Sequence, residues 1–142
     1  YASASFQPGR ALTQADLVCL LASTQGSWLL LDPEAATAEE LDEAYTAAYR
    51  MGALTRQERQ EDALLTRSDV VRMLLDATGY GRVAQLEGIF TCAFSDRAEI
   101  PGSELGYAAL AQALGLAQET YAGARTATRA EAAVMLCRLL EG

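Results

Sequence analysis

The sequence contains no histidine, no lysine and no asparagine, and all eleven of its basic residues are arginines. Without histidine, neither a Ser-His-Asp nor a Cys-His catalytic arrangement can form, and a histidine-containing zinc site is excluded as well. The net charge is −8 and no basic tract occurs. Nucleic acids and anionic membrane surfaces attract clustered positive charge, so we expect neither as a partner. We also expect no metal and no cofactor.

Long apolar runs and cysteines are scarce. No run approaches the roughly 18 apolar residues of a membrane-spanning helix, so we expect no membrane insertion. The three cysteines are far apart and form no CxxC pair; they are Cys19, Cys92 and Cys137. We expect them to be small buried hydrophobic residues. Their odd number argues against a complete disulfide framework, although one pair could form in an exported protein.

The composition is that of a folded domain. The chain has 142 residues, of which 51% are hydrophobic and 21% are charged. These values are ordinary for a soluble globular protein, and the length suits one compact domain with a sizeable core. We therefore expect a single domain over residues 1–142.

Three segments of the chain repeat one pattern, which we call the motif. They are "LTQADLVCLLAS" from Leu12, "LTRSDVVRMLLDATGYG" from Leu65 and "ATRAEAAVMLCRLLEG" from Ala127. In each, a threonine is followed three residues later by an acid and then by apolar residues at helical spacing. The threonine–acid pairs are Thr13–Asp16, Thr66–Asp69 and Thr128–Glu131. This is the signature of a capped helix start, and it predicts helices near 13–23, 66–78 and 128–141.

A further helix is expected before each of the last two motif helices. These are 37–54, with a capping box from Thr37 to Glu40, and 103–117. Gly52 and Gly115 are well placed as left-handed C-caps. Shorter helices are expected from Gly81 and in the charged segment from Thr55. Trp28 is expected in the core.

The predicted fold is therefore all-α, with helical repeats around one core. We expect a partial first repeat at 12–23, a middle repeat at 30–80 and a last repeat at 94–142. The arrangement would be pseudo-threefold, with the first repeat incomplete.

These residues resemble S-layer homology (SLH) repeats. Thr-Arg-Ala-Glu followed by "MLCRLLEG" is similar to one half of such a repeat, and "FSDRAEIPGSELGYAALAQALGLA" from Phe94 is similar to the other half. The resemblance implies a three-lobed helical domain on a secreted bacterial protein. It also implies non-covalent attachment to an anionic cell-wall polysaccharide, in which the motif arginine contacts the sugar in a groove between repeats.

Carried onto this sequence, the resemblance implies ligand-binding roles for Arg67, Arg129 and Asp96. The alternative for the arginines is an exposed helix-start charge paired with a nearby acid, such as Asp69 or Glu131. The alternative for Asp96 is a cap or turn bond to local N–H groups. The sequence departs from the family at Gln14, which stands in place of the first arginine, and lacks the tryptophan that the family commonly has near position 103.

Two functions follow, and a third is weaker. The first is a non-catalytic module that anchors an exported protein of a Gram-positive bacterium to cell-wall polysaccharide, outside the cell. The second is a degenerate SLH-like scaffold or protein-interaction domain without glycan binding, which the departures favour. The third is an enzyme with paired carboxylates, but nothing in the sequence places two acids across a cleft.

Overall fold

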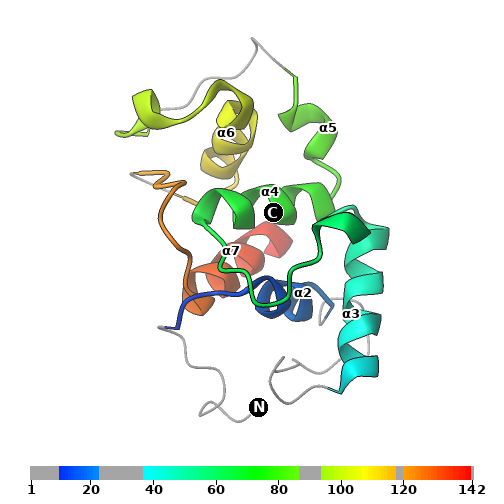
Figure 1. Ribbon diagram of the computed structural model, residues 1–142. Helices are drawn as coiled ribbons and strands as arrows, with labels where there is room; N and C mark the ends of the chain where they lie inside the picture. Colours follow the sequence, from blue (N-terminus) through cyan, green and yellow to red (C-terminus); the bar gives the residue numbers. More distant parts are fainter. Residues whose placement is uncertain (1–9, 23–36, 87–93, 118–119, 142) are drawn as a thin grey trace.

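The computed structural model describes residues 10–22, 37–86, 94–117 and 120–141, and this part is mostly helical, as predicted for an all-α fold. Trp28 and Cys92 lie outside the described residues. The α-helices are α2 (Gln14–Ala22), α3 (Ala38–Met51), α4 (Arg67–Ala77), α5 (Gly81–Ala84), α6 (Leu105–Ala113) and α7 (Arg129–Glu141) (Figure 1). Three short 3-10 turns accompany them: η1 (Arg56–Glu58), η2 (Arg97–Glu99) and η3 (Gly102–Glu104).

The motif helices α2, α4 and α7 begin where the sequence predicts them to begin. In each motif the backbone N–H of the acidic residue donates to the threonine hydroxyl. In return, the backbone N–H of the threonine donates to the carboxylate of the acidic residue. The six donor–acceptor distances lie between 2.9 and 3.3 Å. Two of the first N–H groups at each helix start are thereby satisfied. The shorter aspartates of the first two motifs make the same reciprocal pair as Glu131.

The helices predicted at 37–54 and 103–117 are also present, with shorter bounds. Thr37 and Glu40 form the predicted capping box of α3 at 3.0 and 3.1 Å, and Gly52 ends the helix with φ 86°. The second segment divides into η3 and α6, after which Gly115 has φ 76°. Both glycines are therefore left-handed, as predicted. A side chain with a Cβ rarely adopts this conformation.

The motif helices lie in the middle of the molecule (Figure 1). Helix α7 contacts α2 and α4, whereas α3 packs against α2 and α4, and α6 packs against α4 and α5. Every residue of α2 is buried. Tyr45 on α3 and Tyr107 on α6 are buried and belong to the core.

Backbone hydrogen bonds join the three motif starts in a closed cycle. The N–H of Leu12 donates to the carbonyl of Ala127 at 2.8 Å, that of Ala127 to Leu65 at 2.9 Å, and that of Leu65 to Leu12 at 2.9 Å. We call these three bonds the backbone cycle. Three further bonds lie beside it, from Gln14 to Ala63, from Arg67 to Arg125 and from Arg129 to Arg10. Each motif helix therefore starts against a segment that precedes another motif.

One of the expectations needs correction, and two are confirmed. Cys19 is buried as predicted, but Cys137 on α7 is exposed and is not a core residue. The short helix expected in the charged segment from Thr55 is present as the exposed 3-10 turn η1. The predicted short helix from Gly81 is present as α5.

Candidate functional site

Arg129, the arginine of the last motif, lies at the junction with the first motif. Its Nη2 donates to Asp16 Oδ1 at 2.7 Å, and the two side chains are 6% and 5% exposed. Asp16 is also the capping acid of α2. One carboxylate therefore caps its own helix and neutralises the arginine of another motif, so the expected alternative of an exposed arginine is wrong at this position.

Arg67, the arginine of the middle motif, takes the corresponding place at the junction with the last motif. Its Nη1 donates to Glu131 Oε2, and its Nε donates to the carbonyl of Tyr121 at 2.9 Å. Arg125 Nη2 donates to the same Glu131 oxygen. The alternative from the sequence paired each arginine with a nearby acid, but Glu131 is 64 residues away from Arg67 along the chain. The side chain of Arg67 is only 11% exposed, whereas that of Arg125 is 60% exposed.

In the first motif, Gln14 occupies the position that Arg67 and Arg129 occupy in the other two motifs, so an amide replaces the guanidinium. Its Oε1 accepts hydrogen bonds from the Tyr45 hydroxyl at 2.9 Å and the Gln60 N–H at 2.7 Å. Its Nε2 donates to the Glu58 carbonyl at 2.9 Å. The capping acid Asp69 has no ion-pair partner in the part of the chain that the structure describes. The departure at Gln14 therefore replaces a charged junction with a neutral network.

Asp96 lies close to Arg67 but does not contact it directly. Its two carboxylate oxygens accept the N–H groups of Tyr121 at 2.9 Å and Ala122 at 2.8 Å. These two donors are 25 and 26 residues away along the chain, so the main partners of Asp96 are not the local N–H groups of the sequence alternative. Burial alone would raise the pKa of Asp96, but the N–H groups of Tyr121, Ala122 and Asp96 itself, together with the charge of Arg67, outweigh it and hold the pKa below its ordinary value. Asp96 thus fixes the loop whose Tyr121 carbonyl holds Arg67.

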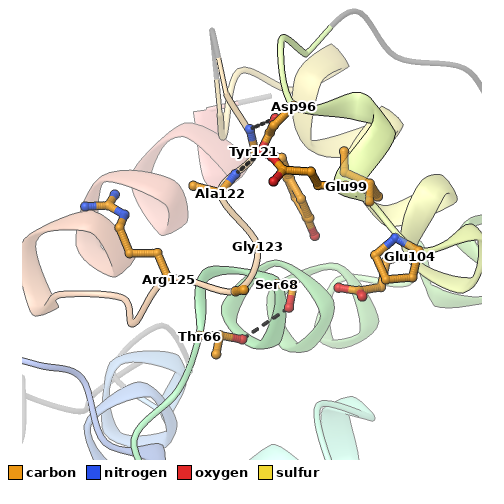
Figure 2. Close-up of a pocket in the computed structure, with 12 residues that line it drawn as sticks. Thr66, Ser68, Asp96, Glu99, Glu104, Tyr121, Ala122, Gly123 and Arg125 are labelled. Atoms are coloured by element: carbon orange, nitrogen blue, oxygen red, sulfur yellow. Dashed lines mark hydrogen bonds between the residues drawn. The ribbon is translucent and has the colours of Figure 1, made fainter.

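A pocket of about 390 Å³ opens beside this loop (Figure 2). Figure 2 shows Tyr121 on one wall, with Thr66 and Ser68 of the middle motif below it and Glu104 opposite. The carboxylates of Asp96, Glu99 and Glu104 line this pocket together with one guanidinium, that of Arg125. An excess of negative charge disfavours an anion at this place.

A second pocket, of about 350 Å³, lies along the first turns of α7, and we call it the α7 pocket. Its polar lining is Arg67, Glu131 and Arg138. Arg138 is held in place by a 2.8 Å hydrogen bond from Nη1 to the carbonyl of Gly115. The apolar lining is Leu116, Ala117, Ala130, Val134 and Met135. This pocket therefore combines guanidinium groups with an apolar wall.

The structure brings Arg67 and Asp96 to one junction and places Arg129 at another. Two further arginines lie at the Arg67 junction, and the sequence analysis did not identify them. They are Arg125 and Arg138. A spacing signal exists for Arg125, because Arg10 and Arg125 both stand three residues before a motif threonine. Arg138 carries no such signal, since only the packing of α7 against residues 115–117 brings it to the pocket.

The Glu131 carboxyl makes stability depend on pH. Burial raises its pKa, but the Thr128 N–H, Arg67 and Arg125 lower it more, so the folded pKa lies below the ordinary 4.5. A depressed pKa stabilises the fold above the unfolded value, and this contribution is lost as the pH falls through the folded value. Asp96 acts in the same direction. Asp76, whose pKa is raised mainly by burial, acts in the opposite direction.

We therefore expect Glu131→Gln to flatten the loss of stability on acidification. Urea unfolding at a series of pH values below about 5 measures this. The wild-type free energy of unfolding should fall more steeply than that of Glu131→Gln, in which the same caps and Asp76 remain. Parallel curves for the two proteins would show that Glu131 is not the titrating group.

Within the described residues, no helix is long and apolar enough to cross a membrane, and no group of histidine, cysteine or acidic side chains is arranged to hold a metal ion. In comparisons with known proteins, the chain matches no protein-family model and no curated protein.

Proposed function

We propose that this chain is a non-catalytic SLH-like module that holds an exported bacterial protein on cell-wall polysaccharide, outside the cell. The backbone cycle carries this proposal. Leu12, Leu65 and Ala127 occupy the same position in the three motif copies and bond to one another in turn. Such a cycle is consistent with a three-lobed, pseudo-threefold domain that has an incomplete first repeat.

The contacts of the motif arginines refine their role. Arg67 and Arg129 are each tied to the capping acid of another motif copy. Buried charges have to be paired, because an unpaired ion away from water is costly. Both arginines therefore join the motif copies, and direct contact with polysaccharide falls to guanidiniums that are open to solvent. Arg125 and Arg138 are exposed and lie at the Arg67 junction.

A second candidate is a scaffold or protein-interaction domain without glycan binding. The observation in its favour is that the charges of Arg67 and Arg129 are compensated within the protein. Exposed Val134 and Leu140 on α7 also offer an apolar surface.

Co-sedimentation with purified Gram-positive cell walls tests the proposal. We expect the protein to sediment with walls that retain their polysaccharide and to stay in the supernatant with walls from which it has been stripped. Excess soluble polysaccharide should release the bound protein. If the protein stays in solution with a panel of intact walls, anchoring is wrong and the scaffold function is favoured.

A further inference from the structure

The segment that precedes the middle motif holds one arginine in a cluster of charged and aromatic side chains. Arg59 donates from Nη2 to Asp42 Oδ1 at 2.8 Å and from Nε to Glu61 Oε2 at 2.9 Å. Its guanidinium also lies over the ring of Tyr45, 4.2 Å from the ring centroid. Two carboxylates and an aromatic ring therefore bind one guanidinium, a combination that suits a planar cation. We call these four residues the Arg59 cluster.

The segment that precedes the last motif repeats the pattern of this cluster with one replacement. An acid, a tyrosine and a third residue stand at the same spacings before the motif threonine. Before Thr66 they are Asp42, Tyr45 and Arg59, and before Thr128 they are Glu104, Tyr107 and Tyr121. The backbone supports this correspondence, because Ala63 and Arg125 are also spaced alike and each accepts an N–H from the start of another motif. Tyr121 thus stands where the middle segment has its arginine.

The three matching residues line one pocket of about 390 Å³, which we call the α4–α6 pocket. Glu104, Tyr107 and Tyr121 line it together with Asp69 and Arg72 of α4. In Figure 2 the carboxylate of Glu104 points toward the start of α4. A cavity therefore lies among the residues that correspond to the Arg59 cluster.

Two carboxylates of this pocket have no ion-pair partner within the described residues. Glu104 corresponds to Asp42, which pairs with Arg59. Asp69 is the capping acid of the middle motif, and the capping acids of the other two motifs each bind a motif arginine. The position that would supply the arginine for Asp69 is Gln14. Both acids therefore lack the cation that their counterparts have.

The guanidinium that lines the pocket is already engaged. Arg72 Nη1 lies 4.0 Å from Asp76 Oδ2, one turn further along α4. Asp76 Oδ1 in turn accepts the hydroxyl of Tyr107 at 2.8 Å. The charges of Arg72 and Asp76 compensate each other, so the charges of Asp69 and Glu104 remain. The pocket therefore favours a cation.

We infer that the α4–α6 pocket binds the guanidinium of an arginine side chain that belongs to another protein, with the carboxylates of Glu104 and Asp69 and the ring of Tyr107 as its ligands. This arginine occupies the pocket as Arg59 occupies its own cluster. A guanidinium can donate to two carboxylates and stack on a ring at once, whereas an ammonium is a compact, strongly hydrated charge. The inference goes beyond the proposed function, because it concerns a protein partner and involves no polysaccharide.

NMR titration with a blocked arginine, Nα-acetyl-arginine-N-methylamide, and separately with the corresponding blocked lysine, tests the inference. We expect the arginine compound to bind more tightly and to shift the backbone signals of residues 103–107. Glu104→Gln should weaken its binding about fivefold, the effect of losing one partly exposed ion pair. The matched control is Glu99→Gln, which removes the same charge from the exposed turn η2, outside the lining of this pocket, and should leave binding unchanged.

Two further variants on α4 test the charge argument. Asp69→Asn should weaken binding of the arginine compound about as much as Glu104→Gln does. Arg72→Gln removes the competing cation and should strengthen binding. The inference is overturned if the arginine and lysine compounds bind equally well, if Glu104→Gln and Glu99→Gln have the same effect, or if Arg72→Gln weakens binding.

Sedimentation velocity over a range of protein concentrations identifies the source of the arginine. An unchanged sedimentation coefficient, together with binding of the arginine compound, supports a partner protein. Self-association that Glu104→Gln abolishes would overturn that source, because a second copy of this chain would then supply the arginine. Co-sedimentation with cell walls should be the same for Glu104→Gln and wild type, and its loss in the variant would contradict the assignment of the pocket to a protein partner.

Discussion

Asp16→Asn should lower the free energy of unfolding by about 3 kcal/mol, because it leaves the guanidinium of Arg129 buried without its 2.7 Å counter-charge. Both side chains of this pair are almost fully buried, so water cannot replace the lost carboxylate. Asparagine has nearly the same shape and can still accept the Thr13 N–H, so the cap of α2 is largely kept. A loss of this size corresponds to a fall of roughly 10 °C in the melting temperature.

Asp69→Asn is the matched control for Asp16→Asn. Asp69 has the same capping position on α4, with its carboxylate 3.1 Å from the Thr66 N–H, but it has no ion-pair partner within the described residues. We expect this substitution to cost no more than about 1 kcal/mol, the usual worth of a cap. Equal losses for Asp16→Asn and Asp69→Asn in urea unfolding would mean that the ion pair adds nothing to stability beyond the cap.

Gly106→Ala should be destabilising by about 2 kcal/mol, although alanine is the better helix former. A Cβ on Gly106 would lie 1.8 Å from the carbonyl oxygen of Ala84 and 2.7 Å from its carbonyl carbon. These are backbone atoms of α5, which cannot rotate out of the way as a side chain can. The shift of α5 away from α6 should outweigh the gain of about 1 kcal/mol in helix propensity.

Gly102→Ala provides the comparison for Gly106→Ala, because a Cβ on Gly102 meets no atom within 4 Å. We expect its free energy of unfolding to stay within about 0.5 kcal/mol of wild type. Thermal and urea unfolding of the two variants measure the difference. If Gly106→Ala is as stable as Gly102→Ala, the α5–α6 contact yields easily and does not fix the position of α5.

The helices were predictable because their signals are local. Each motif threonine and its acid lie three residues apart, so the cap and the following apolar stripe are written in one short segment. The left-handed glycines at 52 and 115 are equally local, since only the backbone at that residue is involved. The bounds of α6 were less predictable, because the chain from 102 to 104 turns as a 3-10 helix before the α-helix begins.

The candidate site was predictable only in part. The sequence singled out Arg67, Arg129 and Asp96, but it suggested only nearby acids as partners for the arginines and local N–H groups for Asp96. Asp16 is 113 residues away from Arg129, and Tyr121 is 25 residues away from Asp96. Pairs of this kind form only when the helices dock, so no spacing along the chain reveals them. Arg138 and the apolar wall of the α7 pocket are hidden from the sequence for the same reason.

By itself, the sequence determined which segments become helices, where each one is capped, and that the chemistry rests on arginine and carboxylates, since histidine and lysine are absent. The tertiary structure alone decided which carboxylate meets which arginine. That choice makes Arg129 part of a buried ion pair, whereas Arg125 and Arg138 stay open to solvent beside Arg67. The physical reason is that burial and charge pairing depend on distances between elements, which the docking of α2, α4 and α7 sets.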